Sequence, residues 1–287
     1  KKMTASIDPM FTEGGPLSQC LDGWEPRSQQ VEMASAVANA FETKRTLLVE
    51  AGTGVGKSFG YLVPAIRRIR EHGEKVVIAT NTITLQEQLM NSDAPTLHKA
   101  FGGGFTPVLV KGRANYVSIR RLERAKQRAT TLLSDAKAIK SLDQLVRWSK
   151  ATIDGSKATM PSMPRGDVWD LARSDAGNCL GRKCPKHESC FYQEARREME
   201  RGNLLICNHA LFFSDLALRM IDRGFLPKYD HVILDEAHSI EDVASDHFGA
   251  SISEARVEYF LRSLVSSSRK PKSAGFLQSL QRDGADP

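Results

Sequence analysis

The segment Ala51-Gly52-Thr53-Gly54-Val55-Gly56-Lys57-Ser58 constrains this chain more than any other, because it follows an apolar run and precedes a helical pattern. Glycines in such a loop let backbone N–H groups face a phosphate, and the next helix adds its N-terminal dipole. The lysine is expected to neutralise the β and γ phosphates, and the serine to hold Mg²⁺. A glycine-rich turn beside a lysine is the alternative, since alanine replaces the first glycine of the strict motif. The predicted ATP-binding residues are Gly52, Thr53, Gly54, Gly56, Lys57 and Ser58.

A second motif, Asp235-Glu236-Ala237-His238, follows the apolar run Val232–Leu234. Two acids at the carboxyl end of a parallel strand lie where ligands bind in such sheets. We expect Asp235 to hold Mg²⁺ through water and Glu236 to polarise the water that attacks the γ phosphate. We expect His238 to couple the nucleotide site to other motifs. Standing alone, an Asp-Glu pair is more often a solvated helix cap or loop.

Five short apolar runs predict buried parallel strands, separated by helical stretches such as Phe59 to Glu71 and the stretch from Leu85 onward. This alternation predicts an α/β fold with a parallel sheet flanked by helices. About ninety residues separate Lys111 from Asn203, too many for a simple crossover, so an inserted subdomain is expected there. The predicted strands are Leu47–Val49, Val76–Ile78, Val108–Val110, Leu204–Ile206 and Val232–Leu234.

Supporting polar residues flank the phosphate loop. Gln30, near Arg27, carries an amide that matches the N6 and N7 edge of adenine, although it could be an ordinary polar residue at a helix start. Thr80 and Asn81 stand at a strand-to-helix junction, where hydroxyl and amide groups suit a nucleic-acid backbone. The alternative for this junction is a capped helix.

Three of the five cysteines, Cys179, Cys184 and Cys190, fall within twelve residues. Five cysteines are too sparse for a disulfide scaffold, and clustered thiolates are soft ligands for iron–sulfur clusters or zinc. His187 could complete a zinc site with them. Three buried thiols that bind nothing are the structural alternative. The two remaining cysteines, Cys20 and Cys207, are expected to be ordinary thiols.

The charge pattern favours a polyanionic partner. The net charge is +6, and the stretch from Lys111 to Arg128 has a single acid, Glu123. A helix so biased can follow a phosphate backbone, with Tyr116 stacking on a base, although such a run can also be a solvated helix face. No run of about 18 apolar residues and no signal-peptide pattern occurs, which favours a cytoplasmic protein without membrane contact. The basic residues are Lys111, Arg113, Arg120, Arg121, Arg124, Lys126 and Arg128.

Taken in order, these motifs resemble the bacterial DinG/XPD family of superfamily 2 iron–sulfur DEAH-box DNA helicases. The resemblance covers roughly residues 24 to 248. It implies a RecA-like domain that couples ATP hydrolysis to translocation on single-stranded DNA, or on DNA with a single-stranded tail, in repair or replication at the bacterial nucleoid. The matching segments are Pro26-Arg27 with Gln30, the phosphate loop, Lys111 to Tyr116, Cys207 to Phe212, and the Asp-Glu-Ala-His box.

The resemblance also implies a [4Fe-4S] cluster on four cysteines, the first of which lies just after the Lys-Gly-Arg-x-Asn-Tyr segment. Ser118 occupies that place here. The chain is therefore expected to hold a four-iron cluster with a substitute ligand, a [3Fe-4S] cluster, or zinc instead.

The resemblance divides the chain into an N-terminal extension (1–23), a RecA-like domain (24–111 and 196–248), an inserted iron–sulfur-type subdomain (112–195) and the start of a helical arch region (249–287). The family's second RecA-like domain is not seen, so we expect a monomeric fragment or truncated form that hydrolyses ATP slowly. Two other classes compete with a helicase. A nucleotide- and DNA-binding protein without unwinding activity remains open, whereas a phosphate-loop kinase is disfavoured by the Asp-Glu-Ala-His box.

Overall fold

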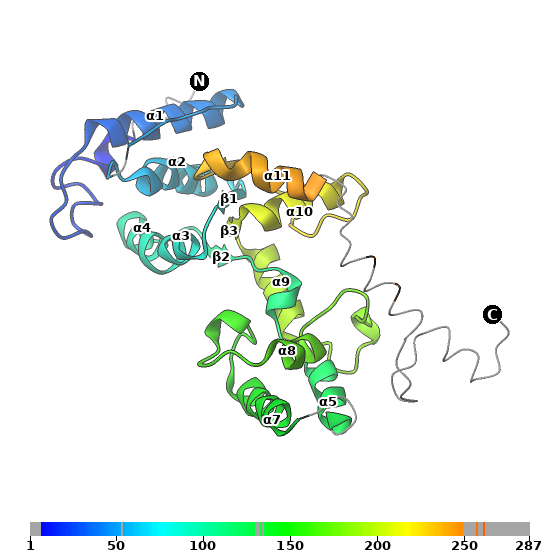
Figure 1. Cartoon of the computed structure of the whole chain (residues 1–287). Helices are drawn as coiled ribbons and strands as arrows, with labels where there is room; N and C mark the ends of the chain where they lie inside the picture. Colours follow the sequence, from blue (N-terminus) through cyan, green and yellow to red (C-terminus); the bar gives the residue numbers. More distant parts are fainter. Residues whose placement is uncertain are drawn as a thin grey trace. The chain divides into compact units, whose positions relative to one another are not determined.

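Four parallel strands form the sheet, in the order β2-β3-β1-β4 (Figure 1). The α/β prediction is therefore confirmed, and so are four of the five predicted strands. The computed structural model describes residues 7–52, 54–129, 133, 135–248, 257 and 261. The strands are β1 (Val76–Thr80), β2 (Pro107–Leu109), β3 (Leu204–Asn208) and β4 (His231–Leu234).

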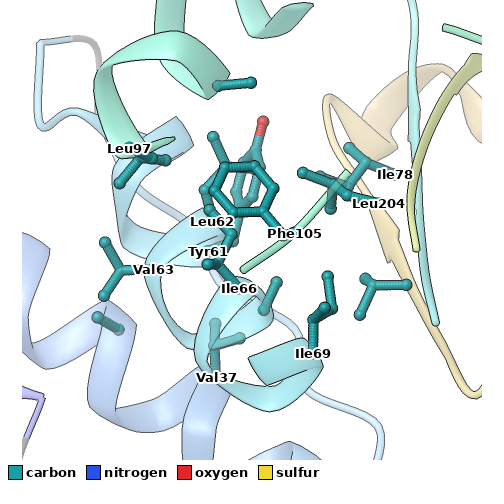
Figure 2. Packing of buried hydrophobic residues seen from close by; sticks show 14 of the residues in the cluster. Val37, Tyr61, Leu62, Val63, Ile66, Ile69, Ile78, Leu97, Phe105 and Leu204 are labelled. Atoms are coloured by element: carbon teal, nitrogen blue, oxygen red, sulfur yellow. The ribbon is translucent and has the colours of Figure 1, made fainter. Parts of the chain in front are cut away.

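The two central strands are buried on both faces, as their unbroken apolar sequence predicts. Alternate residues point to opposite faces, so Ile78 and Leu204 face the same side. Figure 2 shows both residues opposite Leu62 and Ile66 of helix α2, with Phe105 between them. This cluster fixes α2, and therefore the loop that precedes α2, against the sheet.

Helices cover the sheet. Next to the strands lie α1 (Ser28–Thr43), α2 (Lys57–His72), α3 (Ile83–Gln88), α4 (Ala94–Phe101) and α10 (His209–Arg219). A π-helical turn, Leu89–Asp93, joins α3 to α4, and α11 (Ile240–Phe248) follows the 3₁₀ turn Ala237–Ser239. Within the part of the chain that the structure describes, no helix is long and apolar enough to cross a membrane.

The predicted strand Leu47–Val49 is wrong. These residues belong to no helix or strand, and the side chain of Leu48 is 89% exposed. The described sheet ends at β2 and β4, and Leu47–Val49 pairs with neither edge strand. An irregular chain segment, not a strand, therefore leads into the phosphate loop.

Residues 112–195 contain a hydrophobic cluster of their own, which includes Leu142, Leu145 and Trp169. The indole N–H of Trp169 donates to the carbonyl of Ala114 at 3.1 Å. The helices are α5 (Ile119–Gln127), α7 (Ala136–Ala151) and α8 (Gly166–Ala172), and α9 (Phe191–Arg201) leads back toward the sheet (Figure 1). Short 3₁₀ turns occur at Asp8–Met10, Arg113–Asn115, Lys157–Thr159 and Gly181–Lys183.

The chain divides into two compact units, residues 1–240 and 241–287. The inserted segment stays within the first unit, and the second begins at Glu241 instead of residue 249. The sequence-based domain boundaries therefore remain a prediction. Thr53 and most of the predicted arch region lie outside the described residues.

Candidate active site

Side chains at the start of α1 donate hydrogen bonds to the backbone of the phosphate loop. Gly54 and Gly56 adopt positive φ angles of 82° and 79°, and Gly56 forms the N-cap of α2. The Gln30 side-chain amide donates to the Gly56 carbonyl at 2.8 Å, and Arg27 donates to the Gly54 carbonyl. A Cβ atom at Gly56 would collide with the Gln30 amide. Glycine is therefore required at this position both for its φ angle and for space.

Gln30 is only 1% exposed, so its amide is built into the loop and does not lie open to solvent. Its Nε2 group is used by the loop, while its Oε1 atom has no hydrogen-bond partner within the described residues. A buried amide oxygen without a donor is energetically costly. The oxygen lacks a donor in the described chain, and a ligand reaches it only where the loop moves.

The Asp-Glu-Ala-His box leaves the sheet at the end of β4. The Asp235 amide donates to the Ala79 carbonyl at 2.8 Å, which ties the box to β1. Glu236 then adopts a left-handed backbone, with φ 52° and ψ 49°. Non-glycine residues rarely adopt this conformation, and it turns the chain sharply into the short helix Ala237–Ser239.

The two motifs meet. Lys57 Nζ lies 3.1 Å from Glu236 Oε1, although 179 positions separate the two residues. Both side chains are partly exposed, at 35% and 28%. His238, which is largely exposed, places Nδ1 3.4 Å from the second oxygen of Glu236. The first lysine of α2 and the carboxylate after β4 therefore share one accessible site.

Asp235 and Ser58 are held by buried neighbours. Thr80 Oγ1 donates to Asp235 Oδ2 at 3.1 Å, and the Tyr61 hydroxyl also donates to this carboxylate. Burial, followed by the charge of Asp235, raises the pKa of Tyr61 well above its usual value, so the hydroxyl stays protonated as a donor. The Ser58 hydroxyl bonds to the buried Asp93 carboxylate, whose pKa is raised by burial despite the opposing hydrogen bonds.

Tyr61 and Asp93 were not predicted as site residues. Tyr61 follows Ser58 by three positions on α2, so a helical spacing argument could have placed the two side chains on one face. Asp93 lies on the π-helical turn Leu89–Asp93, whose position no periodicity in the sequence indicates.

Thr80 was predicted to contact nucleic acid, and the structure corrects this. Thr80 is 0% exposed and its hydroxyl serves Asp235, because it is the last residue of a strand buried on both faces. Asn81, the next residue, is exposed and remains a candidate for backbone contact.

Three cysteines, Cys179, Cys184 and Cys190, line one cavity together with Ser118 and His187. Ser118 caps α5, since its hydroxyl accepts from the Arg121 amide at 3.4 Å. Burial raises the pKa of Cys179, but hydrogen bonds from the Gly181 amide and from Arg113 outweigh it, with the Arg120 charge adding to them, so the net pKa is lowered. Within the described residues, no three His, Cys, Asp or Glu side chains already stand as a ready-made metal-binding group.

Of the other two cysteines, Cys207 is buried in β3, and burial raises the pKa of its thiol to about 12. Cys20 is partly buried, and neither of these two thiols forms a disulfide within the described residues.

Most of the side chains predicted to contact DNA have partners within the chain. Tyr116 is 5% exposed, with its ring 5.9 Å from that of Tyr192, so it presents no free face to a base. The guanidinium of Arg121 donates to two backbone carbonyls of residues 170–173 at 2.8 and 2.9 Å. Three other basic residues also hold internal partners: Lys111 the Ser156 hydroxyl, Arg113 the Asp175 carbonyl and the Tyr192 ring, and Arg120 the Asn178 carbonyl.

The arginines of the basic stretch therefore hold the cysteine-bearing loop in place, because their guanidinium groups donate hydrogen bonds to the backbone carbonyls of that loop. Its outward-facing charges are Arg124, Lys126 and Arg128, which are exposed. These three residues are what remains of the predicted basic surface on α5 and directly after it.

Two family models match the chain. One, described as DEAD/DEAH box helicase, matches residues 30–140, and the other, described as DEAD_2, matches residues 170–257. The chain is 36% identical over 255 residues to the ATP-dependent DNA helicase YoaA of Haemophilus influenzae, covering 88% of this chain and 39% of that protein. It is 37% identical over 255 residues to YoaA of Escherichia coli, covering 86% and 38%.

A third relative is the ATP-dependent helicase DinG of Mycobacterium tuberculosis, 33% identical over 251 residues, which are 82% of this chain and 37% of that protein. The chain thus spans less than two fifths of the length of these curated relatives. The phosphate loop and the Asp-Glu-Ala-His box both lie inside the matched residues. The chain therefore contains a DEAD/DEAH box helicase domain and a DEAD_2 domain, and over most of its length it is homologous to the helicases YoaA and DinG.

Proposed function

We propose that this chain binds and hydrolyses ATP as the first half of a DNA helicase. The observation that carries the proposal is the contact between Lys57 and Glu236, 3.1 Å apart, which joins the phosphate loop to the Asp-Glu-Ala-His box. An ammonium and a carboxylate in an accessible site, at the positively polarised start of a 16-residue helix, suit a triphosphate.

Each residue has a separate task in this proposal. Lys57 exchanges its Glu236 partner for the β and γ phosphates, and the released Glu236 carboxylate orients the attacking water and accepts its proton. Ser58 and Asp235 would hold Mg²⁺, which neutralises developing phosphate charge. Gln30 would accept a hydrogen bond from the adenine amino group on its unpartnered Oε1.

The DNA-related part of the proposal is that the complete helicase translocates on single-stranded DNA with a second RecA-like domain. Its support is the relatives named as DNA helicases, together with the exposed Asn81 and Arg124. A role in DNA repair or replication, as a monomer at the nucleoid, belongs to the same proposal.

We further propose that the cysteine cavity holds a metal centre. The donor set suits one, because three thiols, a hydroxyl and an imidazole line the same space and Cys179 is biased toward thiolate. Cys179, Cys184 and Cys190 would bind a [4Fe-4S] or [3Fe-4S] cluster, with Ser118 at the fourth position. Zinc on the thiolates with His187 is the other chemistry that these donors can supply.

The nucleotide proposal is tested by titrating Mg·ATP into the chain and assaying hydrolysis with and without single-stranded DNA. Lys57→Ala should weaken Mg·ATP binding by about tenfold or more, because an ion pair to phosphate is lost. Lys99→Ala is the matched control, since Lys99 is exposed on α4. Equal affinity in the wild type and in Lys57→Ala would refute the assignment of the loop. Binding without turnover would favour a nucleotide-binding protein that has no motor activity.

The metal proposal is tested by anaerobic purification, an absorbance spectrum, and iron and zinc analysis. We expect a brown protein with several irons, and Cys184→Ser should lose them. Cys20→Ser is the control, because Cys20 lies outside the cavity. A colourless protein with one zinc per chain would indicate a mononuclear zinc site instead of an iron–sulfur cluster. Protein without iron or zinc would refute the metal centre.

A further inference from the structure

We propose that His209 is a positioning residue that holds the Asp-Glu-Ala-His box in place. It does so through one contact next to Asp235 and another next to Glu236. This inference rests on the proposed nucleotide site. His209 begins α10 directly after β3 and is 1% exposed, and both of its ring nitrogens have partners within the chain. These ring nitrogens lie within hydrogen-bond distance of two oxygen atoms, each of which also bonds to the backbone of the box.

The first of these atoms is the Ala79 carbonyl. His209 Nε2 lies 3.0 Å from this oxygen, which also accepts the Asp235 amide at 2.8 Å. One carbonyl of β1 therefore fixes both the imidazole and the start of the box. Thr80, the next residue along β1, holds the Asp235 carboxylate at 3.1 Å.

The second atom is the Ser239 hydroxyl. Its oxygen lies 3.2 Å from His209 Nδ1 and 3.1 Å from the Glu236 carbonyl. The Glu236 carbonyl belongs to the residue with the left-handed backbone, φ 52°. Such a conformation persists only where its surroundings hold it. The hydroxyl and the Ser239 amide, which donates to the same carbonyl at 3.3 Å, provide that hold.

The positions of the protons in this hydrogen-bond network follow from which atoms can act only as acceptors. A carbonyl cannot donate, so Nε2 carries the proton that reaches Ala79. In the neutral ring, Nδ1 is then an acceptor, so the single Ser239 hydroxyl proton is shared between Nδ1 at 3.2 Å and the Glu236 carbonyl at 3.1 Å. A side chain that served only to fill space would need neither ring nitrogen, yet both nitrogens of His209 have polar partners here.

The test uses variants that remove the two contacts of His209 separately. His209→Gln retains a donor near the Nε2 position, and His209→Asn retains a polar atom near the Nδ1 position, whereas His209→Phe retains neither. Ser239→Ala removes the second contact from the other side. His72→Gln, exposed at the end of α2, is the matched control. Circular dichroism identifies any variant that fails to fold, and Ser239→Ala tests the inference even if His209→Phe does.

The decisive readout is the factor by which Mg²⁺ tightens ATP binding, because this factor depends on where Asp235 is held. Each single-contact variant, including Ser239→Ala, should lower it by about fivefold, the effect of about one lost hydrogen bond, and His209→Phe by more. ATP affinity without Mg²⁺ should stay within about twofold. Ser239→Ala added to His209→Gln should cost nothing further, since both remove one contact.

Two results would overturn the inference. Unchanged Mg²⁺ enhancement in His209→Phe and Ser239→Ala would do so, provided the wild type shows the enhancement. If the wild type binds no ATP, the proposed function fails, and nitrogen-15 NMR of the ring still decides the inference. We expect a slowly exchanging Nε2 proton and an Nδ1 resonance that shifts in Ser239→Ala, whereas fast exchange or an unmoved resonance would contradict it.

Discussion

Glu236 combines a backbone conformation that is uncommon for non-glycine residues with a side chain that lies between Lys57 and His238. Its φ of 52° directs the carboxylate toward Lys57 at 3.1 Å, with His238 at 3.4 Å from the other oxygen. Strained backbone of this kind is concentrated at functional sites, where surrounding contacts over-determine it. Lys57 is therefore already paired with a carboxylate in this structure, and in the proposed function a phosphate displaces Glu236 from it.

Glu74, in the loop between α2 and β1, links α2 to β4 at the opposite end of the sheet. Its carboxylate accepts from Arg68 of α2 at 2.5 and 3.0 Å and pairs with His231 of β4 at 2.7 Å. Burial raises the pKa of Glu74, but the hydrogen bonds from Arg68 and His231 outweigh it and lower the pKa below 4.5. The charged form is therefore favoured in the folded chain.

A pH-dependent loss of stability follows from this depressed pKa. The contribution of Glu74 is fully present above pH 4.5, the ordinary value, and is lost as the pH falls through the lower folded-state value. Glu74→Gln should lower the free energy of unfolding by about 1 kcal/mol at neutral pH, and this difference should shrink below about pH 4.

Urea melts of the wild type and of Glu74→Gln across this pH range provide the measurement. Glu71→Gln is the control, because it removes only an exposed pair with Arg67 on the same helix. A stability difference that stays constant or grows in acid would contradict the assigned direction.

Among single residues, the sequence was most informative where the chemistry needs a fixed spacing. Lys57, Asp235 and Glu236 were predicted from their motifs, and the structure brings the regions together. Thr80 was assigned to the wrong partner, because a hydroxyl at a strand end suits a phosphate backbone as well as a carboxylate. His209 showed no pattern of its own beyond a family-like segment, since its two partners lie 130 and 30 positions away.

At the scale of elements, the four strands that formed are those whose apolar runs have parallel neighbours in the sheet. Leu47–Val49 has the same composition but no neighbouring strand, so its side chains stay exposed. The local pattern indicates which residues suit a strand, whereas strand formation also needs hydrogen-bonded pairing with another strand, which the local pattern does not show. This is why the sequence alone misassigned the segment.

The basic stretch that begins at Lys111 shows the same limit for a helix. Its charge pattern predicts a nucleic-acid surface, yet Arg113, Arg120 and Arg121 donate to carbonyls of residues 173–178 and their neighbour Asp170. Arginine has five N–H donors, and a loop without regular structure offers free carbonyls. The sequence could not reveal this use, because the acceptors lie 49 to 62 positions further along the chain.

At the scale of the whole molecule, the parallel sheet brings the phosphate loop and the Asp-Glu-Ala-His box to one place. β4 lies beside β1, and Ala79 of β1 fixes both Asp235 and His209. α2 packs on the sheet core (Figure 2), which sets the position of Lys57 relative to β4. We propose that one nucleotide is held between these two motifs.

The most direct test uses a zero-length carbodiimide cross-linker, which joins an amine to a carboxylate only where they touch. Lys57 and Glu236, 3.1 Å apart, should form an amide in the nucleotide-free chain, identified by mass spectrometry. Mg·ATP should suppress the product, because phosphates replace Glu236 at Lys57, whereas AMP should not. Glu236→Gln should abolish it. Absence of this cross-link without nucleotide, or its persistence in saturating Mg·ATP, would contradict the account.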